Sequence, residues 1–87
     1  MLIFFLKKIW FEKIKEGTKT IEYREVKPYW EKRLKNIQPG TPCQFRLGYT
    51  KTKIDATITK IVVVPGLNTD LQIDTNVYAI YFKKESV

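Results

Sequence analysis

The spacing of hydrophobic and polar positions predicts a strand followed by a helix at the start of the chain. Residues 2–7 open with the apolar run Leu-Ile-Phe-Phe-Leu, which favours a short buried strand. Residues 8–17, KIWFEKIKEG, place their apolar side chains on one helical face and their charges on the other. Gly17 stands where a glycine commonly ends a helix.

A second strand is predicted over residues 19–25, where polar and apolar positions alternate. Ile21 and Tyr23 fall on one side of this strand, and Glu22 and Arg24 fall on the other. We expect Ile21 and Tyr23 to lie in the core, with Glu22 and Arg24 near a cleft.

A second helix is predicted over residues 27–36, KPYWEKRLKN. Pro28 suits the first position of a helix, and Trp30, Leu34 and Ile37 recur at spacings of four and three residues. The sequence QPGTP that follows is typical of a turn.

The remaining chain has the two-residue period of β-strands. Residues 43–50, CQFRLGYT, alternate clearly. Residues 53–65 alternate up to Ile58, after which the apolar phase shifts, and this shift predicts a bulge or a barrel corner. Residues 66–76 are polar and favour a surface loop or a short helix. Residues 77–82, VYAIYF, are apolar on both faces and predict a central closing strand.

These elements together predict an α+β fold. We expect a single domain over residues 1–87, a small β-barrel of about five strands with two helices inserted early. A hydrophobic fraction of 44%, with two Trp, five Tyr and five Phe, is sufficient for one core. The net charge of +7 favours a polyanionic partner such as nucleic acid.

The counts of cysteine and histidine exclude several chemistries. A single cysteine, Cys43, excludes an intramolecular disulfide and fits a reducing compartment. The lack of histidine excludes a Cys/His zinc site and a Ser-His-Asp triad. We therefore expect no metal and no cofactor. The opening apolar run is too short for a signal peptide or a membrane span, so we expect a cytoplasmic protein, with a monomer as the default state.

The stretch EGTKTIEYRE, residues 16–25, concentrates charge at a position where a core strand is expected. Thr20, Glu22 and Arg24 share one strand face, and Lys19 stands in the adjoining turn. Unpaired charges inside a core would cost several kcal/mol, so this face is either paired or wet. It forms either a recognition cleft, in which Lys19 and Arg24 contact phosphate or a base edge, or a structural ion pair beside a solvated lysine.

The same stretch resembles the ASCH domain of the PUA-like superfamily. The matching residues are Gly17, Lys19, Thr20, Glu22 and Arg24, in the pattern G-x-K-T-x-E-x-R. The resemblance extends over roughly residues 1–64. Within it, the segments KPYWEKRL and FRLGYTK are similar to small ASCH proteins of phages and prophages. It implies a pseudobarrel with a cleft beside the first helix, in a superfamily rich in RNA-binding modules.

Further candidate ligand contacts lie outside the motif. Tyr29 falls off the apolar stripe of its helix and is in register with Arg33, which makes it a candidate for stacking on a base. Arg46 and Gly48 face one side of their strand and are candidates to line the cleft. Tyr49 follows Gly48 within the region of resemblance.

Three functions follow as hypotheses, with RNA or modified-nucleoside binding preferred. The resemblance also implies an amidohydrolase acting on N4-acetylcytidine through a lysine, a threonine and a glutamate. Lys19 matches the lysine, Glu22 stands where the threonine is expected, and Thr20 is one residue after Lys19. A variant of this enzyme hypothesis is a ribonuclease, which would use Lys19 and Glu22 as its acid–base pair. The third hypothesis is a phage-type module that binds another protein.

Overall fold

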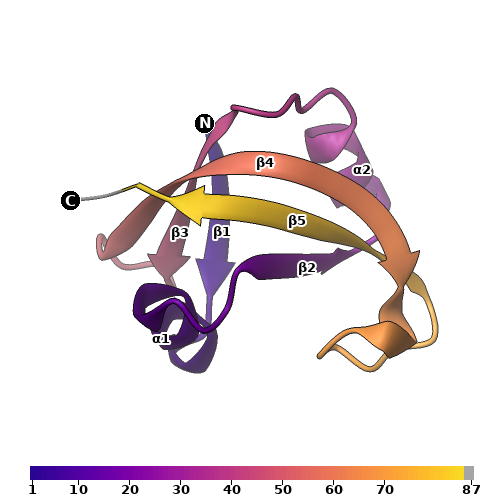
Figure 1. Cartoon of the computed structure of the whole chain (residues 1–87), viewed down its shortest axis with the longest axis horizontal. Helices are drawn as coiled ribbons and strands as arrows, with labels where there is room; N and C mark the ends of the chain where they lie inside the picture. Colours follow the sequence, from indigo (N-terminus) through magenta and orange to yellow (C-terminus); the bar gives the residue numbers. More distant parts are fainter. Residues whose placement is uncertain (86–87) are drawn as a thin grey trace.

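The computed structural model describes residues 1–85 and shows an α+β chain whose one sheet curls into a half-barrel (Figure 1). The elements are β1 (Leu2–Leu6), α1 (Lys8–Glu16), β2 (Ile21–Glu25), α2 (Pro28–Leu34), β3 (Pro42–Leu47), β4 (Lys53–Pro65), the 3-10 turn η1 (Gly66–Asn68) and β5 (Asn76–Lys84). The five strands lie in the order β1-β3-β4-β5-β2. The predicted α+β class, the five strands and the two early helices are confirmed.

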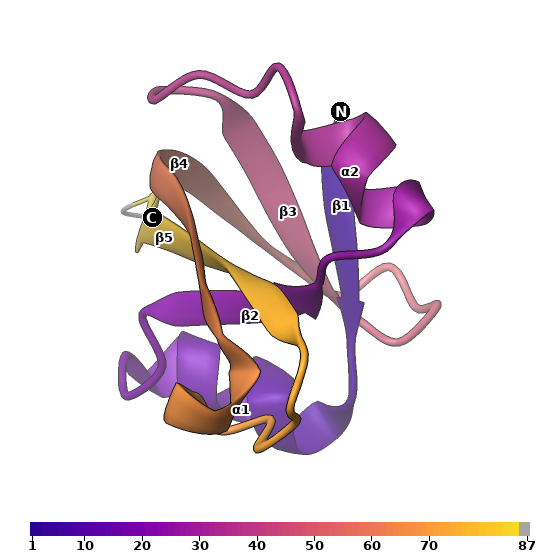
Figure 2. The ribbon, with the colours of Figure 1, turned by 90° about the vertical axis from the view of Figure 1, so that its right-hand side faces the viewer.

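The sheet leaves a seam between its two edge strands. β1 pairs with β3 in parallel, and the other strand pairs are antiparallel, so β1 and β2 stand at opposite ends of the strand order. Figure 2 shows how the curl of the sheet brings these two strands towards each other, with α1 below and α2 beside β1. The predicted barrel is therefore a curled half-barrel with a seam between β1 and β2.

The helix boundaries follow from local signals in the sequence. Gly17 ends α1 in the left-handed region, at φ 86°, and its N–H donates to the Ile14 carbonyl. Only glycine adopts this conformation without steric cost from a Cβ atom. Pro28 opens α2, where its missing N–H has no helical partner to lose. Both predictions are confirmed.

The long strand β4 is bent by a bulge. Its pairing with β5 changes register between Ile58 and Lys60, which confirms the predicted irregularity after Ile58. The bulge lets one continuous strand pair with β3 at its start and with β5 along its length. β5 lies between β4 and β2 and is an interior strand, but β4 holds the middle of the strand order, so the predicted central position of residues 77–82 is only partly confirmed. β4 arches over β5 in Figure 1.

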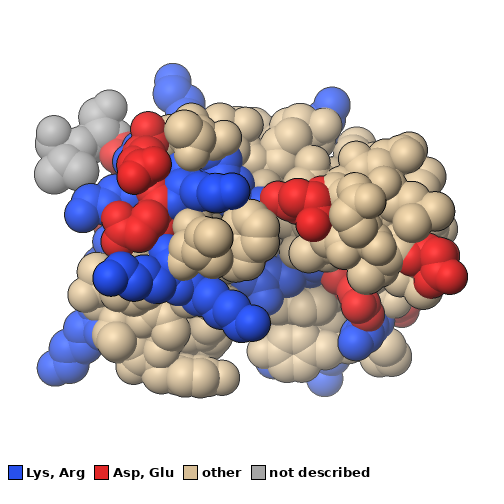
Figure 3. All heavy atoms as spheres, turned by 90° about the horizontal axis from the view of Figure 1, so that it is seen from below, with Lys and Arg blue, Asp and Glu red and all other residues tan. Residues whose placement is uncertain are grey.

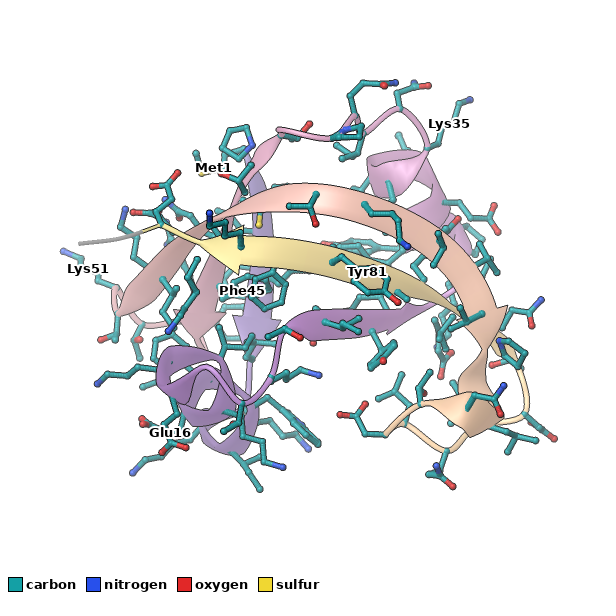
Figure 4. The ribbon with its side chains drawn as sticks, in the orientation of Figure 1. Met1, Glu16, Lys35, Phe45, Lys51 and Tyr81 are labelled. Carbon is teal, nitrogen blue, oxygen red and sulfur yellow. The ribbon has the colours of Figure 1, made fainter. Side chains whose placement is uncertain are left out.

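Aromatic rings fill the interior of the half-barrel. The ring of Phe45, which Figure 4 labels inside the curl of the sheet, lies 5.4 Å from that of Phe4 and 4.5 Å from that of Phe82. The buried core comprises Phe4, Leu6, Phe11, Ile14, Leu34, Cys43, Phe45, Ala56, Ile58, Ile80 and Phe82. These residues come from both helices and from four of the five strands, so segments far apart in the chain share one core.

The predicted orientation of β2 is wrong. Ile21 and Tyr23 are only half-buried, whereas Glu22 is 5% exposed. Glu22 pairs in register with Ile80 of β5, whose side chain is fully buried, so Glu22 points to the inner face of the sheet. The charged face of β2 is the inner face because the strand borders the seam, where partners for these charges are within reach.

Two connecting segments also differ from the sequence pattern. The strand expected over residues 43–50 ends at Leu47, and a turn follows with Gly48 at φ 53° and Tyr49 exposed to 92%. Gly48 donates its N–H to the Leu6 carbonyl, which ties this turn to the end of β1. Residues 66–76 form η1 and a folded loop that ends where β5 begins.

We expect the Cys43 thiol to be unreactive in the folded protein. It is 1% exposed, and burial, followed by Glu85 and Asp55, raises its pKa from 9.0 to about 12. The thiol therefore loses its proton at a lower pH in the unfolded chain than in the folded protein. As a result, the free energy of unfolding is unaffected by ionisation of Cys43 below pH 9.0 and falls as the pH rises from 9.0 towards about 12. Labelling with a disulfide reagent at pH 8 should be slow without denaturant and fast with it. Equal rates would show that the interior is open.

Candidate functional site

A cleft of about 320 Å³ lies between α1, β2, the end of β1 and the loop after η1. The residues that line it are Phe5, Leu6, Lys7, Trp10, Lys19, Glu22, Tyr23, Arg24, Glu25, Asp70 and Leu71. Figure 3 views this side of the molecule from below, where the surface is hollowed and both basic and acidic groups border the hollow. Lys19, Glu22 and Arg24 of the sequence motif thus line one cleft beside the first helix.

The Glu22 carboxylate is the centre of the charged cluster. Its Oε2 accepts hydrogen bonds from Nη2 and Nε of Arg24 at 2.6 and 3.1 Å. Its Oε1 lies 3.6 Å from Nζ of Lys19. The Glu22 side chain is only 6% exposed, and both cations compensate the cost of burying its charge.

Arg24 joins the two edges of the half-barrel. Its guanidinium lies 5.3 Å from the centre of the Phe4 ring and 5.1 Å from that of Trp30, and Nη2 donates to the Phe5 carbonyl at 3.3 Å. A side chain from β2 therefore satisfies a backbone group on the edge strand β1. The structural ion pair between Glu22 and Arg24 is present, and it occupies a wall of the cleft, so the two interpretations of the motif are compatible.

Lys19 is held inside the cleft and is not solvated, which corrects one of the two alternatives. Its side chain is 8% exposed, and Nζ lies 3.4 Å from Oδ2 of Asp70. The same Nζ is 5.2 Å from the ring centres of both Trp10 and Tyr23. Two carboxylates and two aromatic faces therefore surround this ammonium group and interact favourably with its positive charge.

The charged groups that line the cleft balance one another. Three are basic and three are acidic, namely Lys7, Lys19 and Arg24 against Glu22, Glu25 and Asp70. Burial, and then Asp70 and Tyr81, raise the pKa of Tyr23, so its phenol keeps its proton at neutral pH and can donate a hydrogen bond. A cleft with paired charges and aromatic walls suits a neutral, polar, flat ligand better than a free anion.

The structure separates the other candidate residues from this cleft. Thr20 is exposed and lines a neighbouring depression, which shares Lys19 with the cleft. Arg33 stacks on the Tyr29 ring of α2 at 3.6 Å, on the surface that α2 shares with the first residues of β1. None of these three residues, Thr20, Tyr29 and Arg33, lines the cleft.

The remaining candidates lie around β3 and the turn after it. Arg46 donates to Oε1 of Gln44, and Gly48 is bonded to the end of β1. Tyr49 packs on the outer side of Phe5, with the ring centres 4.8 Å apart. None of the three lines the cleft, although Arg46 and Tyr49 lie beside Phe5, which does.

Trp10, Tyr23 and Asp70 are cleft residues that the sequence pattern did not identify. Trp10 lies on the apolar stripe of α1, and Tyr23 alternates with the charged residues of β2, so the pattern assigns both to the core. Asp70 lies in a polar segment without periodicity. A clue for Asp70 could have come from counting charges, because two cations beside one carboxylate require a second acid.

Comparison with models of known protein families and with curated proteins finds no match for this chain. The resemblance of the motif to the ASCH domain therefore stays a prediction. Neither helix in residues 1–85 combines the length and the apolar character that crossing a bilayer would require.

Proposed function

We propose that this protein binds a nucleobase in the cleft, either within RNA or as a modified nucleoside. The observation that carries the proposal is the pairing of aromatic walls, from Trp10 and Tyr23, with the Lys19–Glu22 ion pair at their centre. A base presents two faces for aromatic contact and an edge of donors and acceptors, which matches these two features.

Hydrogen-bonding capacity remains in the charged cluster. An ammonium group has three donors, and the Lys19 ammonium directs one to Asp70 and lies near Glu22. A carboxylate has about four acceptor sites, and Arg24 occupies the Oε2 side of Glu22. Lys19 can therefore donate to a ring nitrogen or carbonyl, and Oε1 of Glu22 can accept from an amino group.

The distribution of charge favours a base over a phosphate as the group inside the cleft. Since the cleft groups balance, the whole net charge of +7 lies outside it. Phosphates would then meet the exterior, where unpaired cations attract a polyanion. The volume of about 320 Å³ lies at the lower end of the range for small-molecule pockets, roughly 300–1,000 Å³, which suits a single base.

The structure offers less support for catalysis. A catalytic lysine must be free to reach its substrate, whereas the ammonium group of Lys19 is already engaged by carboxylates at 3.4 and 3.6 Å. The hydroxyl of Thr20 lies on an exposed residue outside the cleft, so the lysine, threonine and glutamate are not assembled on one wall. Binding without turnover is therefore the proposal.

Replacing Lys19 with alanine should weaken nucleoside binding by roughly tenfold or more, because hydrogen bonds to charged groups contribute about 1.5–3 kcal/mol. Calorimetric titration with the four ribonucleosides and N4-acetylcytidine would measure this effect. Lys27→Ala is the matched control, because the Lys27 side chain is 63% exposed and pairs with Glu25 outside the cluster. Equal affinity of both variants and wild type would contradict the proposal.

The same samples separate binding from hydrolysis. Release of acetate from N4-acetylcytidine should not exceed the blank rate for wild type or for Lys19→Ala. Turnover by wild type that disappears in Lys19→Ala would replace the binding proposal with an amidohydrolase that uses Lys19.

A further inference from the structure

An exposed aromatic pair continues the cleft onto the outer surface. Phe5 lines the cleft, is 40% exposed, and stacks with the ring of Tyr49 at a centroid distance of 4.8 Å. Tyr49 is 92% exposed and stands in the turn after β3, which also carries Lys51, labelled in Figure 4 at the edge of the molecule. Tyr49 adds little to the core at this exposure, so its ring is available to a ligand.

Cations flank this aromatic pair along the outer face of the sheet. Phe5 is in register with Arg46 of β3, and Arg46 is in register with Lys53 of β4, so the three side chains form one row. Lys53 is paired with Asp55 at 3.2 Å, whereas the guanidinium of Arg46 contacts the neutral amide of Gln44. The row therefore keeps a positive excess beside the exposed rings.

We propose that the ligand of this protein is a single-stranded oligonucleotide, with one base in the cleft and the adjoining base stacked on the Phe5–Tyr49 pair. This inference rests on the proposed function of the cleft. Exposed rings with adjacent cations bind single strands because bases stack on the rings while phosphates meet the cations. Arg46, which lies beside Phe5 in the sheet, is placed to meet the phosphate between the two bases. The contacts use chemistry common to RNA and DNA, and the experiment includes both.

The test compares a nucleoside with oligonucleotides of two, four and six residues, as RNA and as DNA, by calorimetry and fluorescence anisotropy. We expect affinity to rise from the nucleoside to the dinucleotide and to fall with salt. Tyr49→Ala should lower oligonucleotide affinity by roughly fivefold or more, the size expected for one lost stacking contact. It should leave nucleoside affinity unchanged. Tyr49→Phe keeps the ring and should retain the wild-type affinity.

The possible failures are distinguishable. If nucleosides bind in the cleft but oligonucleotides bind no tighter, or if Tyr49→Ala binds them like wild type, this inference is wrong and the proposed function stands. If neither nucleosides nor oligonucleotides bind, the proposed function fails as well. Self-association that Tyr49→Ala abolishes, without oligonucleotide binding, would assign the aromatic pair to a contact between two copies of the chain.

Discussion

Glu22→Ala is expected to lower the free energy of unfolding by roughly 3 kcal/mol, because removing one partner of a buried ion pair leaves the other charge uncompensated. The carboxylate is 6% exposed and binds Arg24, whose guanidinium is enclosed by two rings and the Phe5 carbonyl. Without Glu22, both Arg24 and Lys19 would lose a counter-charge at the seam. Denaturation in urea, followed by circular dichroism, would measure the change.

Glu25→Ala provides the matched control on the same strand. Glu25 also pairs with a basic residue, Lys27 at 2.9 Å, but the two side chains are 37% and 63% exposed. Exposed pairs contribute about 0–1 kcal/mol, so this variant should remain close to wild type. A similar loss for both variants would show that the Glu22 cluster does not hold the seam. In a double-mutant cycle, Arg24→Ala should cost less when Glu22 is already alanine.

Gly66→Ala should destabilise the fold by roughly 1–3 kcal/mol and also weaken ligand binding. A Cβ atom at Gly66 would collide with the backbone carbonyl of Thr75 and would lie 2.6 Å from that of Ile73. The Gly66 N–H donates to the same Thr75 carbonyl, so the segment must move as a unit to relieve the collision. That segment carries Asp70, which forms the wall of the cleft opposite α1.

Asp70→Asn separates the two effects of Gly66→Ala. It removes the charge that contacts Lys19 but leaves the backbone of the segment in place. We expect Asp70→Asn to alter nucleoside affinity with little loss of stability, since the Asp70 side chain is 43% exposed. If Gly66→Ala keeps wild-type stability and affinity, the loop does not support the cleft.

The elements that depend on local signals could be predicted from the sequence. The end of α1 at Gly17, the start of α2 at Pro28 and the bulge after Ile58 each follow from a few adjacent residues. The orientation of β2 could not, because alternation separates two faces of a strand without saying which one is inner. The rule that apolar side chains lie inside selects the wrong face here, since the partners that make Glu22 acceptable come from other segments.

Long-range contacts explain the errors at the candidate site as well. Lys19 meets Asp70 across 51 positions in the chain, and Arg24 meets the Phe5 carbonyl across 19. No periodic pattern carries this information. Tyr49 stays outside the cleft for a similar reason, since a turn beginning at Gly48 takes it out of the strand and onto Phe5.

The most direct test of base binding in the cleft is a nuclear magnetic resonance titration of ¹⁵N-labelled protein with nucleosides. The chain has two tryptophans, and the structure places them differently: Trp10 lines the cleft, whereas Trp30 packs on Phe4 in the core. We expect the indole N–H signal of Trp10 to shift with the amides of Lys19, Glu22 and Tyr23, and that of Trp30 to move little. Saturating nucleoside that leaves the Trp10 signal in place, or shifts confined to Trp30 and α2, would contradict a nucleobase site in this cleft.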